Sequence, residues 1–442
     1  MTAGDDDQQP FLTKYLKSVM AHFKMVCSTF VDLPNAILSC LLTDWLKWKE
    51  VSRLDCALCN RVYRQSWLIL LRNDCVFPMV SSYYYRIPPN NYEWCVMRKI
   101  RTKEFAFDNA TLSTNNATRA WFENTAQFIT SLKVSSTKVS PIKSIIQVCN
   151  KLRVLHVSRC EIDDVYWDLL RNNPNLEELR VIDSVSRRAT MPTDLSLLKL
   201  KKLEVLHNTF PAGYFVSFLA QLPALQSLKL AKQSYTGVYK ALSSARANLV
   251  HLDVSYLMHM KDQNDSFCLL MRSLKSGLRC LMLPIIEEFT EREFQSIVDS
   301  HAHSLRCLSI PDGTHVSVEF IMNIISKLPK LHTLHIPCAR VFPLSPQRIV
   351  SSTVSHLSLD FKWTNTDLLS LLVALFPAVT KISISCGRGD FVVTDIIKLL
   401  ELCPLVHTIC VEFQEVIEEL SAALPKVSFF KYSKLDIFAH DY

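Results

Sequence analysis

The sequence predicts an α/β solenoid behind a small all-α module, and two observations support this prediction. In the first, an apolar residue is followed by a second apolar residue three positions later and by a third two positions after that. In the second, a proline often stands two residues before the pattern begins. Self-similarity at such a period marks units that bury their apolar faces only against their neighbours. The copies begin, at intervals of 21 to 29 residues, at Ile129, Leu152, Leu176, Leu203, Leu225, Leu249, Leu278, Leu305, Leu331, Val354, Val379, Val406 and Val427.

Each copy is expected to form a helix, a turn and a strand. In DLLRNNPNLEELRV, which starts at Asp168, the first six residues have helical character and Pro174 ends them. Leu176, Leu179 and Val181 then follow with the spacing of a strand. Proline lacks an amide hydrogen and has a fixed φ, so it stops a helix and favours an extended segment. The same proline recurs at Pro223, Pro329, Pro377, Pro404 and Pro425.

The composition indicates a folded intracellular protein. A chain of 442 residues, 49% hydrophobic and 21% charged, can bury a large core. Its 15 cysteines are odd in number and scattered, which is typical of a reducing compartment. The acidic start MTAGDDDQQP and apolar runs no longer than LLSLLVALF predict neither a secretory signal nor a membrane span. We therefore expect a cytoplasmic and/or nuclear protein without a membrane partner.

Several classes of function are disfavoured by the motifs that the sequence lacks. Only 7 glycines argue against phosphate-binding loops, and there is no GxSxG, HExxH or P-loop motif. Cys56 and Cys59 form a CxxC, but no second pair follows at zinc-site spacing. The formal charge of +7 is mild, and no basic run typical of nucleic-acid binding occurs. We expect no enzymatic activity, no metal, no other cofactor and no nucleic-acid partner.

One copy shows the character of the repeat most clearly. In CNKLRVLHVSRCEIDDVYWDLLRNNPNL, which starts at Cys149, a cysteine precedes the strand, a second follows it, and Ile-Asp-Asp opens the helix. This stretch resembles the leucine-rich repeats of the ribonuclease-inhibitor type, especially the cysteine-containing subtype. The resemblance covers roughly residues 100–442 and implies a horseshoe with a parallel sheet inside and helices outside. Irregular curvature is expected at the Leu203 copy, where Asn208 replaces the third apolar residue, and after Ala231.

A module of different composition, residues 30–71, precedes the repeats. Asp32 or Leu33-Pro34 can begin a helix whose expected buried face is Ile37, Leu38 and Leu41, and Val51, Leu54 and Leu58 predict a second helix. The order of residues resembles an F-box. The matching positions are Leu33-Pro34, Ile37-Leu38, Glu50-Val51, Leu54 and Cys59-Asn60-Arg61. The acidic pair comes one residue late, and the expected tryptophan is Tyr63 or is displaced to Trp67.

The F-box resemblance implies docking on the small adaptor of a cullin-RING ubiquitin ligase. Alternatively, the same apolar residues only close the bundle and cap the open end of the solenoid. The expected division of the chain is an N-terminal extension (1–29), the F-box-like module (30–71), a linker packed on the first repeat (72–100) and the repeat domain (101–442). The expected adaptor-binding residues are Leu33, Pro34, Ile37, Leu38 and Leu41, with Trp45 or Trp48 as an aromatic anchor.

The central strand positions predict a second candidate site on the concave face. In the first repeats these positions form a cationic or titratable row, which could receive an acidic or phosphorylated substrate or could be an ordinary solvated face. Further along, the row becomes neutral and more apolar. The predicted substrate-binding residues are Lys133, His156, Arg180, His207 and Lys229.

Together these features favour the substrate-recognition subunit of an F-box-type ubiquitin ligase, with adaptor, cullin and protein substrate as partners. The leading alternative is a leucine-rich-repeat scaffold or inhibitor without adaptor binding. A third is a leucine-rich-repeat activator of a small GTPase, for which the sequence contains no specific motif.

Overall fold

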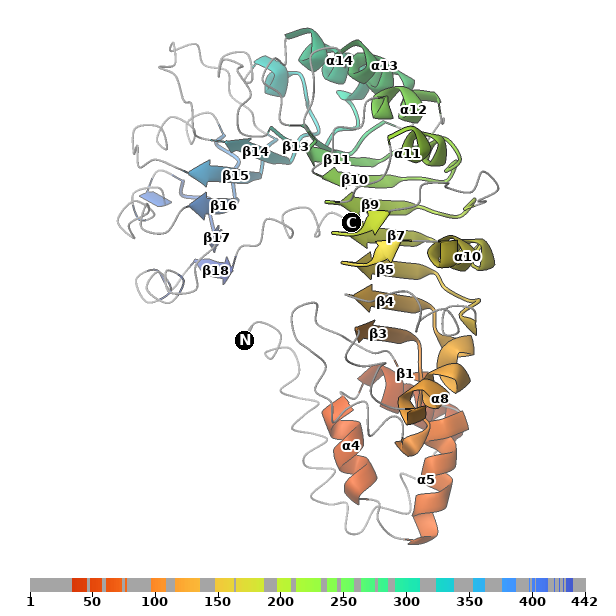
Figure 1. Cartoon of the computed structure of the whole chain (residues 1–442). Helices are drawn as coiled ribbons and strands as arrows, with labels where there is room; N and C mark the ends of the chain where they lie inside the picture. The colour runs from red at the N-terminus through yellow and green to blue at the C-terminus, as the bar shows by residue number, and fades with distance from the viewer. Residues whose placement is uncertain are drawn as a thin grey trace. The chain divides into compact units, whose positions relative to one another are not determined.

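Two compact units make up the chain, residues 1–155 and 156–442. The boundary falls inside strand β5 (Val154–Ser158), and each unit is described by itself (Figure 1). The computed structural model describes residues 34–45, 48–57, 61–73, 76–77, 97–108, 116–135, 148–162, 164–186, 197–207, 212–231, 237–244, 248–257, 264–274, 277–284, 291–310, 323–337, 353–361, 376–386, 397, 400–401, 403–411, 417, 421, 424 and 427–431.

The described part of the first unit begins with helices, as the sequence predicts. Helix α3 (Asn35–Cys40) starts directly after Pro34, whose carbonyl accepts hydrogen bonds from the amides of Ile37 and Leu38 at 2.9 and 3.1 Å. Pro34 is the N-cap residue with a ψ of 136°, so its missing amide hydrogen costs the helix no hydrogen bond. A π-helical turn (Leu41–Trp45), α4 (Trp48–Ala57) and α5 (Arg61–Asn73) follow. Their buried apolar residues are Leu38, Leu42, Val51, Leu54, Trp67, Leu70 and Leu71.

Short parallel strands follow the helices within the first unit. Strand β1 (Val76–Phe77) pairs with β2 (Arg101–Thr102), and β3 (Glu104–Asp108) pairs with β4 (Ser131–Ser135). Helix α8 (Asn116–Thr125) and a 3-10 turn (Ala126–Phe128) connect the last two strands. The ring of Phe105 packs on Trp121 and Phe122, with ring centroids 5.4 and 4.7 Å apart. Strand β3 belongs to a copy that precedes the first predicted one. The pattern does not predict this copy, because the polar residue Thr102 stands where the pattern requires an apolar one.

The second unit is a parallel sheet with helices along one side, as Figure 1 shows for α10 to α14. This arrangement confirms the predicted fold class. A short parallel pair, β6 (Glu161–Ile162) and β8 (Val185–Ser186), lies beside the main sheet. The other strands are β7 (Glu178–Ile182), β9 (Lys202–Leu206), β10 (Ser227–Ala231), β11 (His251–Tyr256), β12 (Cys280–Met282), β13 (Cys307–Ser309), β14 (Thr333–Pro337), β15 (His356–Phe361), β16 (Lys381–Cys386), β17 (Thr408–Val411) and β18 (Ser428–Lys431). The helices are α10 (Asp164–Asn172), α11 (Ala212–Leu219), α12 (Val238–Ser244), α13 (Asn264–Ser273) and α14 (Glu291–His301).

One backbone contact recurs from copy to copy. It involves the residue that directly follows the first apolar residue of a copy, here called the lead position. The carbonyl of Arg279, for example, accepts hydrogen bonds from the amides of Arg306 and Cys307 at 2.8 and 2.9 Å. The same double contact fixes the spacing of each copy against the next. In the second unit it is made by the carbonyls of Glu177, Lys201, Gln226, Val250, Arg279, Arg306, His332, Ser355 and Thr380.

The register corrects two predicted copies, those at Leu203 and Val427. In the copy predicted at Val427, Phe429 and not Phe430 pairs with Ile409, so the frame is shifted by one residue and Phe430 is exposed. Leu203 pairs with Leu179 and Leu228, so it is the second apolar residue of its copy, which begins at Leu200 and contains no irregularity. The prediction chose the wrong frame because leucines at 197, 200, 203 and 206 repeat every three residues. An irregularity does occur at Ala231. There β10 shifts its register against β11, so that Lys229 pairs with Asp253 but Ala231 pairs with Tyr256.

Candidate functional site

The predicted adaptor-binding residues divide by exposure within α3 and its continuation. Pro34 and Ala36 are exposed, and the side chain of Ile37 is 49% exposed. Leu38 is only 3% exposed and belongs to the core of the bundle, whereas Leu41 is half-buried. Leu33 lies outside the described residues, and Trp45 ends the π-helical turn. An apolar side chain that a helix directs to solvent is a candidate contact for a partner.

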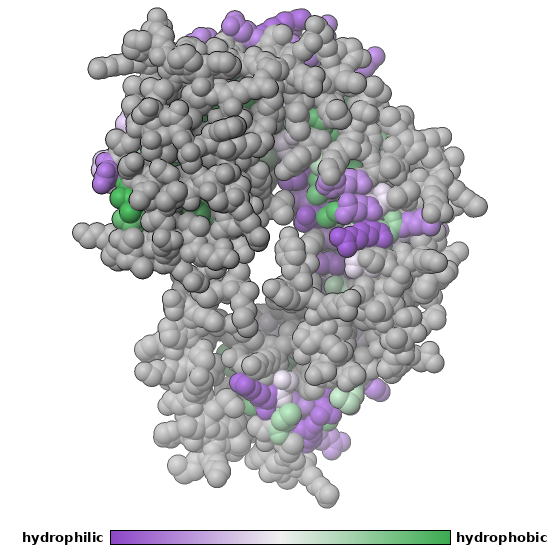
Figure 2. Space-filling model, turned by 60° about the vertical axis from the view of Figure 1, so that its left-hand side comes forward, coloured by the Kyte–Doolittle hydropathy of each residue, from purple (hydrophilic) through white to green (hydrophobic). Residues whose placement is uncertain are grey.

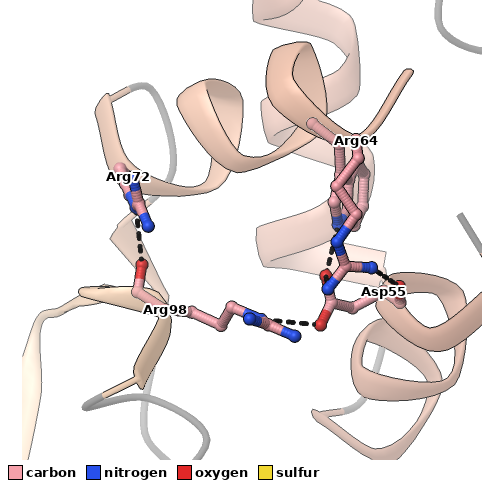
Figure 3. Close-up of polar contacts among 5 residues, drawn as sticks. Asp55, Arg64, Arg72 and Arg98 are labelled. Carbon is pink, nitrogen blue, oxygen red and sulfur yellow. Dashed lines mark hydrogen bonds and ion pairs between the residues drawn. The ribbon is translucent and has the colours of Figure 1, made fainter. Parts of the chain in front are cut away.

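The buried carboxylate of Asp55 connects the helices of this module (Figure 3). Asp55 is on α4 and is 0% exposed. The indole nitrogen of Trp67 donates to Oδ1 at 3.1 Å, and Nε of Arg98 donates to Oδ2 at 2.9 Å. The guanidinium of Arg64 lies 3.6 Å from Oδ1 and donates to the backbone carbonyl of Asp55 at 2.6 Å. A buried charge requires such partners, because its hydration is lost.

The same cluster extends from the helices toward the first strands. Nε of Arg72, on α5, donates to the carbonyl of Arg98 at 3.1 Å. Two residues further on, the carbonyl of Ile100 accepts a hydrogen bond from the indole of Trp121 at 2.7 Å. Strand β2 begins at the next residue. Side chains from α4 and α5 therefore hold the segment that leads into the strands of the first unit.

The second candidate site is a row of side chains on the sheet, here called the sheet row. Leu179 and Val181 point into the core, so Arg180 between them lies on the opposite face, because side chains alternate along a strand. The pairing of the second unit places Glu204, not His207, in this row. His207 follows β9, is exposed and has a left-handed φ of 56°. The row in the second unit is His156, Arg180, Glu204, Lys229, Asp253, Met282, Ser309, His335, Ser358, Ser383, Cys410 and Phe430.

Lys133 holds the equivalent strand position in the first unit. It lies in β4, is half-buried and pairs in register with Ala106 of β3. The predicted basic residues are thus at central strand positions in four cases out of five.

Carboxylates on neighbouring strands compensate the cations of the row. Nε of Arg180 lies 2.8 Å from Glu204, and Nζ of Lys229 lies 2.8 Å from Asp253. Lys202 lies 3.3 Å from Glu204 and 3.7 Å from Glu178. The predicted row of like charge is therefore a set of alternating charges, which attract one another along the face of the sheet.

The first imidazole of the row is part of the same set. Nε2 of His156 lies 3.1 Å from Oε1 of Glu178. This hydrogen bond, followed by the nearby charge of Lys202, lowers the pKa of Glu178 although partial burial opposes the shift. Glu178 is consequently ionised at neutral pH and offsets positive charge at this end of the sheet.

Past β11 the row has no formal charge. Cys280, Met282 and Cys307 form a buried apolar cluster on β12 and β13. Beyond them, imidazole and hydroxyl groups pair across neighbouring strands: Nδ1 of His335 with Oγ of Ser358 at 2.9 Å, and Nε2 of His356 with Oγ of Ser383 at 2.8 Å. On the face of the molecule drawn in Figure 2, hydrophilic residues are grouped with hydrophobic ones between them.

The residues that the structure describes lack two features. They contain no group of three or more His, Cys, Asp and Glu side chains arranged to hold a metal ion. Cys56 is an exposed free thiol, and Cys59 lies outside the described residues. Among the described helices, none is long and apolar enough to cross a membrane.

The sequence matches no protein-family model, and no curated protein matches it. Among solved structures, the chain is similar to an internalin (inlF) from Listeria monocytogenes, with 17% identity, coverage of 71% of this chain and 89% of that chain, and a TM-score of 0.40. It is also similar to a structure of the Rad7 and Elc1 complex in yeast, with 13% identity, coverage of 88% and 96%, and a TM-score of 0.45. A TLR13–ssRNA13 complex is similar with 16% identity, coverage of 76% and 42%, and a TM-score of 0.34.

The sheet itself defines the class of protein. One short parallel strand per copy, with helices on one side and buried leucines between the layers, is the fold of a leucine-rich-repeat solenoid.

Proposed function

We propose that this chain is the substrate-recognition subunit of a cullin-RING-type ubiquitin ligase. The observation that supports this most directly is the exposed apolar side chain of Ile37 on a helix whose next residue, Leu38, is buried in the bundle. Exposed apolar residues point to a binding surface when they are grouped, and Pro34, Ala36 and Ile37 are exposed together at the start of α3. In this role the chain is not an enzyme, because catalysis belongs to other subunits of the ligase, and it acts in the cytoplasm or nucleus.

In the proposed interface, Pro34, Ile37 and Leu41 contact the ligase adaptor, which in turn binds the cullin. Leu38 supports the helix from inside. The Asp55 cluster consists of Asp55, Arg64, Trp67, Arg72 and Arg98. In the proposed complex it holds α4 and α5 to the segment that enters β2. An adaptor bound on α3 would then be held by the same rigid unit as the first strands.

The substrate would bind along the sheet row. Glu204, Asp253 and Glu178 compensate the positive charge of the cations there. The sheet row therefore does not favour an acidic or phosphorylated substrate. The alternating charges between β5 and β11 suit a substrate segment of mixed charge. The hydroxyl and imidazole groups from β13 onward suit an uncharged polar one.

A pull-down with a matched control tests the adaptor interface. Ile37→Asp places a charge on α3 at a side chain that is already 49% exposed, and Leu269→Asp does the same on α13 at a side chain that is 53% exposed. Both proteins should fold. We expect the unaltered chain and L269D to recover adaptor and cullin, read by mass spectrometry, and I37D to lose both.

If the folded, unaltered chain recovers no adaptor, the ligase proposal fails. The helical module would then be only a cap for the repeats, and the scaffold or inhibitor function would take its place. Equal loss of adaptor in I37D and L269D would also count against an interface on α3.

A further inference from the structure

The edge at which strands β12 to β14 begin carries a line of exposed basic side chains. Arg279, Arg306 and His332 occupy the lead positions of three successive copies and are all exposed. The amide of Arg306 donates to the carbonyl of Arg279, and the amide of His332 donates to the carbonyl of Arg306, each at 2.8 Å. The three residues are thus direct neighbours across the strands. Lys330, exposed in the turn before His332, adds a further cation.

This line, here called the basic edge, consists of Arg279, Arg306, Lys330 and His332. It differs from the sheet row in its charge balance. The described segments 277–284, 301–310 and 323–337 contain Arg279, Arg306, Lys327 and Lys330 and no Asp or Glu. Within the described part of the chain, Arg279, Arg306 and Lys330 form no ion pair. Among the described residues, the acidic residue nearest in sequence to this line is Asp299 on α14, which accepts a hydrogen bond from Gln295 at 2.6 Å.

Neither folding nor the ends of the helices account for these cations. The residues that follow the lead positions, Cys280, Cys307 and Thr333, are buried, whereas the lead side chains are exposed. The ring of His332 also contacts the next copy, with Nδ1 3.3 Å from the carbonyl oxygen of Thr353. Helix α13 ends at Ser273 and α14 at His301. Arg279 and Arg306 come more than one helical turn later, and the favourable effect of a helix C-terminus on a cation falls off within its last turn.

We propose that the basic edge binds an acidic segment, rich in Asp and Glu, of a protein partner. Neighbouring parallel strands are about 4.8 Å apart, so an extended segment that crosses them can place a carboxylate against each arginine in turn. Guanidinium groups bind carboxylates through paired, charge-assisted hydrogen bonds. The same three segments contain no Phe, Tyr or Trp, and single-stranded nucleic acids are usually bound through such aromatic platforms. The charge complementarity therefore favours a polypeptide.

This proposal is independent of adaptor binding, because it uses other residues and another unit of the chain. Acidic partners are therefore expected at the edge of the sheet. They are not expected at the sheet row, where carboxylates already pair with the cations.

A peptide titration tests the basic edge on the full chain. The probe is fluorescein-labelled decaglutamate, with a labelled Gly-Ser peptide of equal length as the uncharged probe and fluorescence anisotropy as the readout. The edge variant combines Arg279→Ala, Arg306→Ala and Lys330→Ala. The matched control removes the same charge from exposed cations elsewhere in the unit: Arg159→Ala, Lys240→Ala and Arg292→Ala.

We expect the unaltered chain to bind decaglutamate but not the uncharged peptide, with an affinity that falls as salt is raised. The edge variant should bind about tenfold more weakly, and the control variant within about twofold of the unaltered chain. Should the edge variant fail to fold, Arg306→Gln alone is expected to weaken binding about twofold to threefold.

Three results would overturn the proposal. They are absence of decaglutamate binding, equal losses in the edge and control variants, and tighter binding of an oligonucleotide of the same charge through the same residues. The last result would identify the edge as a nucleic-acid site instead.

Discussion

The carboxylate of Asp55 and the carboxylates of the sheet row are all paired with arginine or lysine, yet the two regions use their ion pairs differently. Asp55 is 0% exposed and joins segments that are up to 43 residues apart in sequence. Glu204 and Asp253 join only neighbouring strands, at a face where Lys202 remains 40% exposed. A buried charge with many partners fixes elements in place, whereas paired charges on a face can exchange partners when another molecule arrives.

The largest effect is expected from removal of the buried charge. Asp55→Ala leaves the indole of Trp67 and the guanidinium of Arg98 without their acceptor, and the loss of one partner of a buried ion pair costs about 3–5 kcal/mol. Hydrogen exchange should show lost protection in α4, α5 and residues 97–101. The control is Asp168→Ala, which breaks an exposed pair with Arg171 and should cost less than about 0.5 kcal/mol. If both variants unfold at the same urea concentration, Asp55 does not fix the helices.

The buried imidazole of His301, for which the described residues show no ion pair, provides a contrast to the buried carboxylate of Asp55. His301 is 1% exposed, and its Nδ1 accepts a hydrogen bond from the amide of Leu278 at 3.3 Å. Burial lowers its pKa to about 4, against a smaller opposite effect of the Met271 carbonyl. In the unfolded chain this histidine therefore binds a proton below about pH 6.5, whereas in the folded chain the same imidazole stays neutral down to about pH 4. Stability should decrease across that window as the pH falls, by up to about 3 kcal/mol.

Urea unfolding of the unaltered chain and of His301→Gln, at a series of pH values, isolates this contribution. The stability advantage of the unaltered chain should be largest near neutral pH and should shrink toward pH 4. An advantage that stays constant over the whole series would mean that His301 does not titrate differently in the two states.

The smallest effect is expected at the sheet row. A double-mutant cycle of Arg180→Ala and Glu204→Ala should give a coupling of about 1 kcal/mol, because both side chains are partly shielded, at 20% and 11% exposed. The matched pair Lys201 and Glu177, 3.1 Å apart with a lysine that is 54% exposed, should couple by about 0.5 kcal/mol or less. A coupling as large as the cost of Asp55→Ala would remove the distinction between the two regions.

The fold could be predicted from the sequence because each copy carries its own pattern of leucines and prolines. Errors arose where that pattern is ambiguous. At Leu203 leucines repeat every three residues, so two frames fit, and only pairing with Leu179 selects the one that brings Glu204 into the row. Thr102 concealed the strand at Glu104–Asp108, because a buried threonine replaces the apolar residue of the pattern.

The candidate sites were less predictable than the fold. Ile37 was found because the F-box resemblance pointed to it, but periodicity predicted that it would be buried with Leu38. The Asp55 cluster had no signal in the sequence, because the indole and guanidinium groups that contact its carboxylate come from residues 9, 12 and 43 positions away. The central strand positions do not predict the basic edge, because its residues occupy or adjoin the lead positions, whose pattern appears only when the strands are aligned.

The carbonyl that accepts two amides at each lead position has a consequence for how such a chain can evolve. From the lead position at Glu177 to that at Thr380, each copy is attached to the next through the same backbone groups, so the attachment does not depend on which side chains the two copies carry. A whole copy can be duplicated or deleted while its neighbours still find matching partners. Substitutions on the exposed side chains are equally free. The length of the binding surface and its chemistry can therefore change independently of one another.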